Sequence, residues 1–315
     1  MGKATRESYG MALLELGKEN EKVVVLDADL SKSTKTEGFK KEFQDRFFNM
    51  GIAEQNLIGV AAGLANVGLI PFASTFAVFA TGRAFEVIRN SVCYPKANVK
   101  IAATHAGITV GEDGGSHQSV EDIALMASLP NMNVIVPADH IEAMQAVKVA
   151  SEINGPVYLR FGRCSTPDIY DENYEFKLGK ASVLKEGNDV TVIATGMMVS
   201  KAIEVAKELE KENISVRVIN MSTIKPIDRE VIIKAAKETK GIVTAEEHSI
   251  IGGLGDNVSS VVCSSFPTRV EKVGINDTFG ESGTPDELME KYKLTSDEII
   301  KKVKIILNSG VSING

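Results

Sequence analysis

The feature that most constrains the fold is a repeated alternation of short apolar runs with segments of helical pattern. In the first half of the chain, apolar runs at 23–27, 99–104, 134–136 and 157–159 alternate with such segments. A continuous apolar run is typical of a strand that is buried on both faces of a parallel sheet. Strands that alternate with helices predict a doubly wound, mainly parallel sheet. We therefore expect an α/β fold.

The same alternation starts again further along the chain, with strand-like runs at 189–194, 215–219, 241–245 and 269–273. A chain of 315 residues is long enough for two domains that each have a core. We expect two doubly wound α/β domains, at 1–165 and 186–315. An exposed linker at 166–185, which contains proline, tyrosines and several acids, would join them.

Composition excludes several classes of partner and location. The net charge of −7 and the pI of about 5.4 argue against nucleic acid or an anionic membrane as the main partner. Cys93, Cys164 and Cys263 are too widely spaced for a disulfide framework or a zinc motif. No apolar run approaches the roughly 20 residues that cross a bilayer, and the first residues lack a signal-peptide core. These features predict a soluble protein of the reducing cytoplasm.

Glu54 stands just before the small and apolar residues 57–64, which can pack on every side. A carboxylate that is partly buried without a partner tends to take up a proton, so a glutamate here invites a hydrogen-bonding partner. The simpler interpretation is an acid that interacts with the dipole of a helix N-terminus. Phe76 and Phe79 follow, spaced for one helical face, which is also typical of core packing.

A glycine-rich loop at 104–118 contains two of the four histidines, His105 and His117. Glycine lets the backbone approach a ligand closely, and histidine can donate and accept protons near neutral pH. We therefore expect a functional loop. A metal site made of His105, Asp113 and His117 is an alternative, although a fourth ligand is missing.

Polar residues also follow the strands at 23–27 and 157–159. Asp29 and Ser33 lie beyond the first strand, where ligands of open α/β sheets collect, although turn chemistry explains them equally well. Arg163 follows the second, and its planar, permanently charged group suits a phosphate. A plain surface arginine is the alternative for Arg163, and Arg160 competes for the same role.

Together, these motifs resemble the transketolase family. The stretch 47–163 resembles the pyrimidine-binding domain, and the rest of the chain resembles the C-terminal domain, which in transketolases serves assembly more than chemistry. The motifs that carry the resemblance occur in family order: Gly51-Ile-Ala-Glu-Gln55, Ser74-Thr-Phe76, Thr104-His105, Gly111-Glu-Asp-Gly114 and His117-Gln118.

The resemblance implies thiamine diphosphate as the cofactor and transfer of a two-carbon ketol unit from a ketose phosphate to an aldose phosphate. Glu54 would hydrogen-bond the aminopyrimidine ring and help to activate the cofactor. Phe76 and Phe79 would hold that ring by stacking, with Asp29 on the cofactor side. Gly82 stands where some family members have a pocket tyrosine, so that part of the pocket must be built differently.

The resemblance also implies substrate contacts. His105 and His117 would bind substrate and act as acids and bases, since histidine titrates near neutral pH. Asp113 would bind a sugar hydroxyl. The sugar phosphate would be held by Arg6, Ser33 and Arg163.

One family motif is absent from the sequence. The Gly-Asp-Gly motif that carries the diphosphate-binding magnesium of thiamine enzymes does not occur. The chain therefore resembles the C-terminal half of a split transketolase and is expected to hold no metal itself. An N-terminal subunit would bring the motif and the magnesium ligands, most plausibly in a two-plus-two assembly.

Other functions stay open at this stage. A deoxyxylulose-5-phosphate synthase and the beta subunit of a 2-oxo-acid dehydrogenase share this architecture, although Thr104-His105 favours transketolase. A non-catalytic regulatory or assembly subunit is a different class of alternative. The glycine string at 251–256 could suggest a dinucleotide loop, but the full spacing is missing and tight helix packing or a subunit contact fits better.

Overall fold

The computed structural model describes residues 2–308 and contains two mainly parallel sheets. The part of the chain up to residue 160 contains α1 (Thr5–Glu19), β1 (Val23–Asp27), α2 (Ser31–Thr34), α3 (Glu37–Glu42), η1 (Gln44–Arg46), β2 (Phe47–Asn49), α4 (Glu54–Asn66), β3 (Ile70–Phe76), η2 (Phe79–Arg83), α5 (Phe85–Val87), η3 (Ile88–Cys93), β4 (Lys100–Thr104), η4 (Ile108–Asp113), α6 (Asp122–Ser128), β5 (Asn133–Ile135), α7 (His140–Glu152) and β6 (Val157–Arg160).

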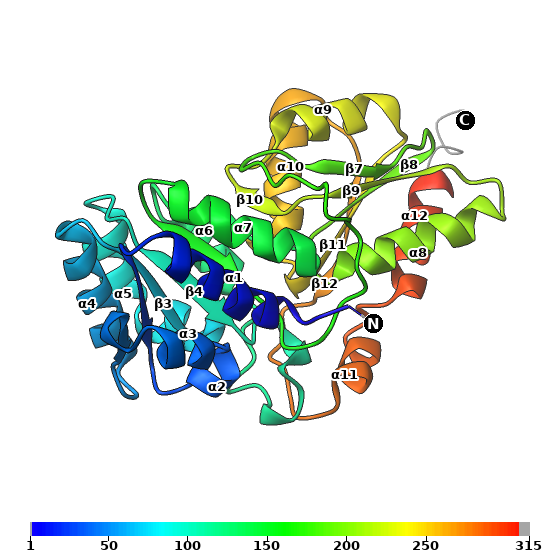
Figure 1. Ribbon diagram of the computed structural model, residues 1–315. Coiled ribbons are helices and arrows are strands. Elements are labelled where there is room, and N and C mark those ends of the chain that lie inside the picture. Colours follow the sequence, from blue (N-terminus) through cyan, green and yellow to red (C-terminus); the bar gives the residue numbers. More distant parts are fainter. Residues whose placement is uncertain (1, 309–315) are drawn as a thin grey trace.

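The second part contains β7 (Ser182–Lys185), β8 (Val190–Ala194), α8 (Met198–Glu210), β9 (Val216–Asn220), β10 (Thr223–Lys225), α9 (Arg229–Glu238), β11 (Ile242–Ser249), α10 (Leu254–Ser265), β12 (Val270–Ile275), α11 (Pro285–Lys291) and α12 (Ser296–Asn308). The seven-stranded sheet has the order β10-β5-β6-β4-β3-β1-β2, and the five-stranded sheet has the order β12-β11-β8-β9-β7. Figure 1 shows the two sheets with helices around them. The predicted pair of doubly wound α/β domains is confirmed.

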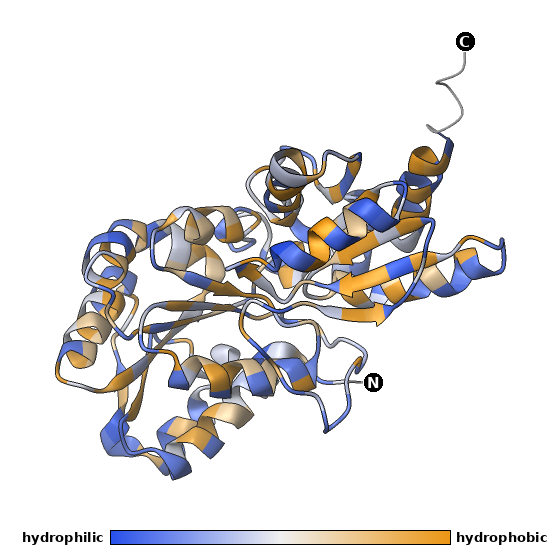
Figure 2. Ribbon diagram, turned by 90° about the horizontal axis from the view of Figure 1, so that it is seen from above, coloured by the Kyte–Doolittle hydropathy of each residue, from blue (hydrophilic) through white to orange (hydrophobic). Residues whose placement is uncertain are grey.

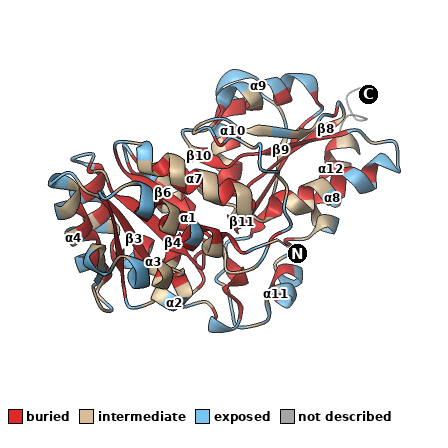
Figure 3. Cartoon of the chain, viewed as in Figure 1, coloured by how far each residue is buried: buried red, intermediate tan, exposed pale blue. Residues whose placement is uncertain are grey.

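The central strands of the first sheet are buried along their whole length because helices cover both faces. On one face, α1 and α7 pack Tyr9, Leu13 and Val147 against the sheet. On the other face, α4 and α6 contribute Leu57 and Ile123 to a second cluster. Figure 3 shows this gradient from buried strands to exposed outer helix faces. Each large apolar side chain buried in this way stabilises the fold by about 1.5–3 kcal/mol.

The second sheet is covered in the same manner. Helix α8 buries Val199, Ala202, Val205 and Leu209, whose spacing places them on one helical face. Figure 2 shows the resulting two-sided colouring of the helices, with hydrophobic residues toward the sheets and hydrophilic residues outward. Within residues 2–308, no helix is both long enough and apolar enough to cross a membrane.

The two domains share structure at their junction. Strand β10 comes from the second half of the chain but pairs antiparallel with β5 of the first sheet, with Thr223 opposite Ile135. The segment expected as a linker, 166–185, is tied down in part, since the Asp139 carboxylate accepts the backbone N–H of Ile169 at 2.7 Å and of Tyr170 at 2.9 Å. Its last residues form β7, which pairs antiparallel with β9. The junction is therefore bonded on several sides.

The expectation that Phe76 and Phe79 share one helical face is wrong. Strand β3 extends to Phe76, because its ladder with β4 continues to the pair Phe76–Thr104. The segment that follows contains two π-helical stretches, η2 and η3, on either side of α5. Phe76 therefore ends a strand, and Phe79 begins the segment after it.

Candidate active site

Most of the predicted site residues gather at the carboxyl ends of neighbouring parallel strands. Strands β6, β4, β3, β1 and β2 are adjacent in the sheet, and ligands of open α/β sheets bind beyond such ends. The residues that follow these ends are Arg163, His105, Phe79, Ser33 and Glu54.

The centre of the site is a cluster of four rings. The His105 imidazole stacks on Phe76 with ring centroids 3.8 Å apart. Phe79 lies nearly parallel to Phe76, at 6.0 Å and an interplanar angle of 8°. His117 meets Phe79 edge-on, at 5.3 Å and 75°. Strand register explains the contact, because Phe76 pairs with Thr104, the residue before His105.

His105 is fixed by its backbone and by both ring nitrogens. Its φ of 56° is left-handed, which is uncommon for a residue with a side chain and occurs mostly where the surroundings enforce it. Arg6 Nη1 lies 2.9 Å from Nε2. Since arginine can only donate, Nε2 must accept, and the proton is on Nδ1, which faces Thr104 Oγ1 at 2.9 Å.

Burial, together with the nearby positive charges and above all that of Arg6, lowers the pKa of His105 to about 3. The imidazole is therefore neutral at physiological pH. The expectation that both histidines titrate near neutral pH is wrong for His105 in this chain. It can still accept and donate hydrogen bonds as a neutral ring.

Positive charge collects on one side of His105. Arg6 also donates from Nη1 to the backbone carbonyl of Ser33 at 3.1 Å. Burial, followed by the charge of Arg163, lowers the pKa of Arg6. Its Nε is buried and has no hydrogen-bond partner among the residues that the structure describes. Lys35, which the sequence analysis did not single out, adds a further positive charge toward His105. In an acidic protein, such a local cluster suits an anionic ligand.

Asp27 shapes the turn that brings Ser33 to Arg6. Its buried carboxylate accepts the Leu30 backbone N–H at 2.5 Å and the hydroxyls of Thr34 at 2.6 Å and Thr36 at 2.9 Å. Sequence reasoning took Asp27 only as the end of a strand. The strand-terminal acid followed by two threonines was the available signal.

Asp29 lies on the exposed edge of the site. Its φ is 64°, and its carboxylate accepts a hydrogen bond from Asn49 Nδ2 at 2.9 Å. The structure places it near β2, with no hydrogen bond to the four-ring cluster among the described residues.

Glu54 is the first residue of α4 and is only 2% exposed. Its Oε2 accepts a hydrogen bond from Arg83 Nη1 at 2.8 Å. The Arg83 guanidinium also lies over Phe79, 4.7 Å from the ring centroid. Arg83 was missed in the sequence, although its position four residues after Phe79 was a signal. Gly82, where some family members have a pocket tyrosine, is exposed, with open space where a Cβ would stand. The side chain that packs against Phe79 in this chain is that of Arg83.

The glycine-rich loop holds Arg163. Arg163 Nη1 donates to the carbonyl of Val110 and to Glu112 Oε2, the latter at 3.3 Å. Asp113 is exposed, and the structure gives it no bond to the ring cluster. Arg160 does not compete for a ligand, because it is buried and paired with Asp122 at 2.7 Å.

Comparison with known proteins decides the family. Residues 1–168 match the transketolase pyrimidine binding domain, and residues 179–299 match the transketolase C-terminal domain. The first match alone covers more than half of the chain. The chain belongs to the transketolase family. Both matches agree with the domain order expected from the motifs.

Relatives of this transketolase chain are of two lengths. A protein of Methanocaldococcus jannaschii, named as a transketolase C-terminal section, is 52% identical over 96% of this chain and 95% of that protein. The 6-deoxy-6-sulfo-D-fructose transketolase subunit SqwH of Clostridium sp. is 41% identical over 94% of this chain and 92% of that subunit. Mus musculus transketolase is 38% identical, but the chain spans only 49% of its length.

Solved structures confirm the fold. One described as a split gene transketolase, inactive beta4 tetramer, has a TM-score of 0.92 and 60% identity, covering 98% of this chain and 99% of that chain. Transketolase from Leishmania mexicana has a TM-score of 0.82 and 26% identity, and the match covers 46% of it. The resemblance to the C-terminal half of a split transketolase is thus confirmed.

The glycine string of the transketolase C-terminal domain is a packing motif in this structure. Glu246, buried at the centre of β11, accepts the backbone N–H groups of Leu254 at 2.6 Å and Gly255 at 2.8 Å. A Cβ at Gly253 would lie 2.1 Å from the Glu246 carboxylate. The Glu246 carboxylate therefore occupies the position at the N-terminus of α10 where a dinucleotide-binding loop would bind a phosphate.

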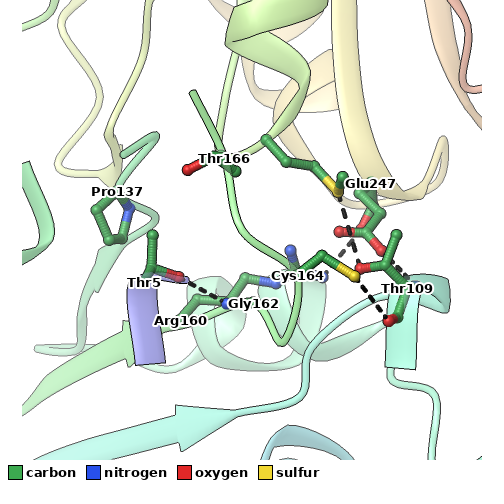
Figure 4. A pocket seen from close by; sticks show the side chains of 10 residues that line it. Thr5, Thr109, Pro137, Arg160, Gly162, Cys164, Thr166 and Glu247 are labelled. Carbon is green, nitrogen blue, oxygen red and sulfur yellow. Dashed lines mark hydrogen bonds between the residues drawn. The ribbon is translucent and has the colours of Figure 1, made fainter. Parts of the chain in front are cut away.

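A small enclosed cavity is lined by sequence neighbours of the predicted site residues, and not by the predicted residues themselves (Figure 4). It is lined by Thr5 and Gly162, the neighbours of Arg6 and Arg163, and Thr5 Oγ1 accepts the Gly162 backbone N–H at 2.8 Å. Glu247 from β11 also lines it, and burial raises the pKa of that carboxyl. The cavity therefore lies at the domain junction, and the bond within it ties together the backbones that carry the two arginines.

Metal binding by the loop histidines has no support in the geometry. Across residues 2–308, no group of three or more His, Cys, Asp or Glu side chains is placed to hold a metal ion. The alternative site made of His105, Asp113 and His117 is therefore dropped.

Proposed function

We propose that this chain is the C-terminal half of a two-chain, thiamine-diphosphate-dependent transketolase. The reaction would move a two-carbon ketol unit from a ketose phosphate to an aldose phosphate. One observation carries the proposal: the rings of His105, Phe76 and Phe79 are stacked in that order, with the Arg6 guanidinium bonded to His105 and the pair of Arg83 with the buried Glu54 carboxylate at Phe79. A flat ring and an anionic sugar could therefore be held side by side.

The cofactor end fits the residues present. When bound, thiamine diphosphate supplies a carbon nucleophile that can carry the ketol unit. Glu54 would hold a proton between its carboxylate and the aminopyrimidine ring, and Phe76 and Phe79 would hold the ring by stacking, worth about 0.5–1.5 kcal/mol beyond burial. The Arg83 guanidinium, a planar donor, already makes both kinds of contact with Glu54 and Phe79. Asp29 would line the exposed edge of this end.

The substrate end would use the positive cluster. Arg6, Arg163 and Lys35, with Ser33 on the adjacent turn, would hold a sugar phosphate through charge-assisted hydrogen bonds. His105, neutral as its low pKa requires, would orient a substrate oxygen by hydrogen bonding.

The remaining loop residues would handle hydroxyl groups. His117 lies at the edge of Phe79 and is half-buried, so it is placed to exchange a proton with a substrate hydroxyl. Asp113, exposed on the same loop, would recognise a sugar hydroxyl once substrate fills the space between them.

A partner chain would complete the site. The sequence lacks the Gly-Asp-Gly motif, and the hard oxygen ligands of the magnesium that would bind the diphosphate must come from elsewhere. We assign them to an N-terminal transketolase subunit, in a two-plus-two assembly in the cytoplasm. The M. jannaschii relative is named as a C-terminal section, and the similar solved structure is described as an inactive beta4 tetramer of a split gene transketolase. Both descriptions support a chain that needs a second one.

The test is to copurify the native complex and assay ketol transfer with added thiamine diphosphate and magnesium. The donors should include a ketose phosphate and the sulfo sugar in the name of the Clostridium relative, since a positive cluster can hold either anion. Ketol transfer that depends on thiamine diphosphate supports the proposal. A complex that binds the cofactor but transfers no ketol unit from any donor would overturn it.

A further inference from the structure

One short segment of the C-terminal domain lies beside the histidine-bearing end of the glycine-rich loop 104–118. Residues 279–284, which precede α11, lie against residues 111–118 of that loop, the part that carries Asp113 and His117. Figure 1 shows α11 beside the short helical turns of this loop. The sequence resemblance implied that the C-terminal domain serves assembly more than chemistry, so this contact needs its own account.

The two segments meet at glycine positions, where an added side chain would come too close to the other segment. A Cβ on Gly114 would lie 2.5 Å from Ser282 Oγ, and a Cβ on Gly115 would lie 2.6 Å from the carbonyl oxygen of Gly280. A Cβ on Gly280 would lie 1.7 Å from Gln118 Oε1. Such distances are far below a van der Waals contact, so glycine at these positions is what allows the approach.

Gln118 joins the two segments. It is 3% exposed, and its side-chain Nε2 donates to the carbonyl oxygens of Ile108 at 3.1 Å, Gly111 at 3.2 Å and Glu281 at 2.9 Å. The carbonyls of Ile108 and Gly111 belong to the glycine-rich loop 104–118, and that of Glu281 belongs to the C-terminal domain. One amide group therefore ties the start and the middle of the loop to residue 281.

The segment 279–284 is also bonded to α11 and to the residue that follows it. Tyr292 Oη donates to the Phe279 carbonyl at 2.9 Å, and Lys291 forms an ion pair with Glu281. Thr284 closes a capping box at the start of α11, a motif that stabilises a helix N-terminus. The loop therefore packs against a segment that is itself bonded to neighbouring residues of the C-terminal domain.

We propose that Gln118 is a positioning residue for ketol transfer, and that through it the C-terminal domain holds His117 and Asp113 in register with the bound sugar. The inference rests on the proposed function. His117 follows the same turn, since its backbone N–H donates to the Gly114 carbonyl at 2.9 Å. Arg163 is bonded to the same loop at Val110. A shift of the loop would therefore move acid–base and phosphate contacts together.

The first test uses Gln118→Met, which keeps the length of the side chain but removes the amide donor. In the complex with the N-terminal subunit, we expect kcat to fall about 10- to 100-fold, because small misplacements of positioned groups cost that much. The dissociation constant of thiamine diphosphate should stay within twofold, since Glu54 and Phe76 are not on the loop. Gln145→Met on α7, where the structure gives the amide no bond, is the matched control and should keep wild-type kinetics.

The second test uses Gly280→Ala, which forces a methyl group toward Gln118 Oε1. It should reproduce the loss of kcat, and the double variant should lose much less than the product of the two single effects, since both act on one contact. Gly283→Ala is the control in the same segment, because its Cβ would meet only the Leu288 side chain, at 3.2 Å, and would not reach Gln118.

Hydrogen exchange provides a readout that does not depend on activity. In Gln118→Met, amides at 111–118 should exchange faster than in the wild type, while those at 70–76 stay unchanged. Unchanged exchange, or faster exchange with wild-type kinetics, would overturn the positioning role. If the wild-type complex transfers no ketol unit, the proposed function fails, and a positioning role in ketol transfer fails with it. Faster exchange in Gln118→Met would then show only that Gln118 holds the loop in place.

Discussion

Arg83 donates a hydrogen bond from Nη1 to the buried Oε2 of Glu54, at 2.8 Å, while its guanidinium lies 4.7 Å from the centroid of Phe79. A planar donor stacked on an aromatic ring and bonded to a carboxylate makes the contacts that the aminopyrimidine would make. Arg83 is about half exposed, with 49% of its side-chain surface accessible. Only the Arg83 end of this pair is open to water, so the guanidinium can move away when another donor takes its place at Glu54.

Arg83 and the cofactor ring are therefore expected to compete for Glu54. Replacing Arg83 with Ala should raise the affinity of the free chain for thiamine several-fold, because the carboxylate no longer has an internal partner. Calorimetry at millimolar thiamine measures the effect. Arg89→Ala, on the neighbouring exposed turn, should change nothing. An unchanged or weaker affinity in Arg83→Ala would speak against the competition.

Glu54→Gln should leave the fold intact and remove most ketol transfer, because an amide cannot exchange the ring proton as a carboxyl group does. The residue is buried at the start of α4, and Gln keeps its shape. Circular dichroism and thermal unfolding check the fold, and steady-state kinetics of the complex check the activity. Activity within twofold of the wild type would remove Glu54 from the mechanism.

His105 should make the free chain less stable in acid. Its folded pKa of about 3 lies below the unfolded value of about 6.5, so the unfolded chain binds the extra proton between these values. The free energy of unfolding should then fall as the pH drops from 6.5, with a slope from this residue that approaches about 1.4 kcal/mol per pH unit.

The pH effect is measured as a difference between two proteins. Urea unfolding of the wild type and of His105→Gln, at several values between pH 7.5 and 4.5, isolates the contribution of His105 from those of the buried acids. The gap between their unfolding free energies should close or reverse toward low pH. Parallel curves would mean that His105 is not a buried neutral imidazole.

The two arginines near the end of β6 should behave differently. Arg163→Ala should chiefly raise KM for phosphorylated sugars, since it removes a charge-assisted contact and is partly exposed. Arg160→Ala should instead destabilise the fold by about 3–5 kcal/mol, because it leaves the buried carboxylate of Asp122 unpaired. KM values with phosphorylated and unphosphorylated donors, together with urea unfolding, separate the two effects. Equal KM changes for both donors would exclude a phosphate contact by Arg163.

The sequence predicted the parts of the site that lie within local patterns. The parallel sheet followed from apolar runs, and its strand ends placed His105 and Arg163 on one edge. The order of short motifs also identified the family. These signals succeed because strand burial and loop composition are properties of neighbouring residues.

Contacts between distant segments could not be predicted in this way. The pair of Arg83 with Glu54, and that of Gln118 with the carbonyl of Glu281, join residues from different elements. No local pattern specifies such a meeting. The charge state of His105 was missed for a related reason, since it depends on burial and on Arg6, which is far away in the sequence.

The most direct measurement is a titration of the purified N-terminal subunit into a fixed amount of this chain, followed by ketol transfer with thiamine diphosphate and magnesium. The account predicts no turnover at the start, a linear rise, and a plateau at one N-terminal subunit per chain. Robust turnover by this chain alone, with contamination excluded, or an absence of turnover at every ratio, would contradict it.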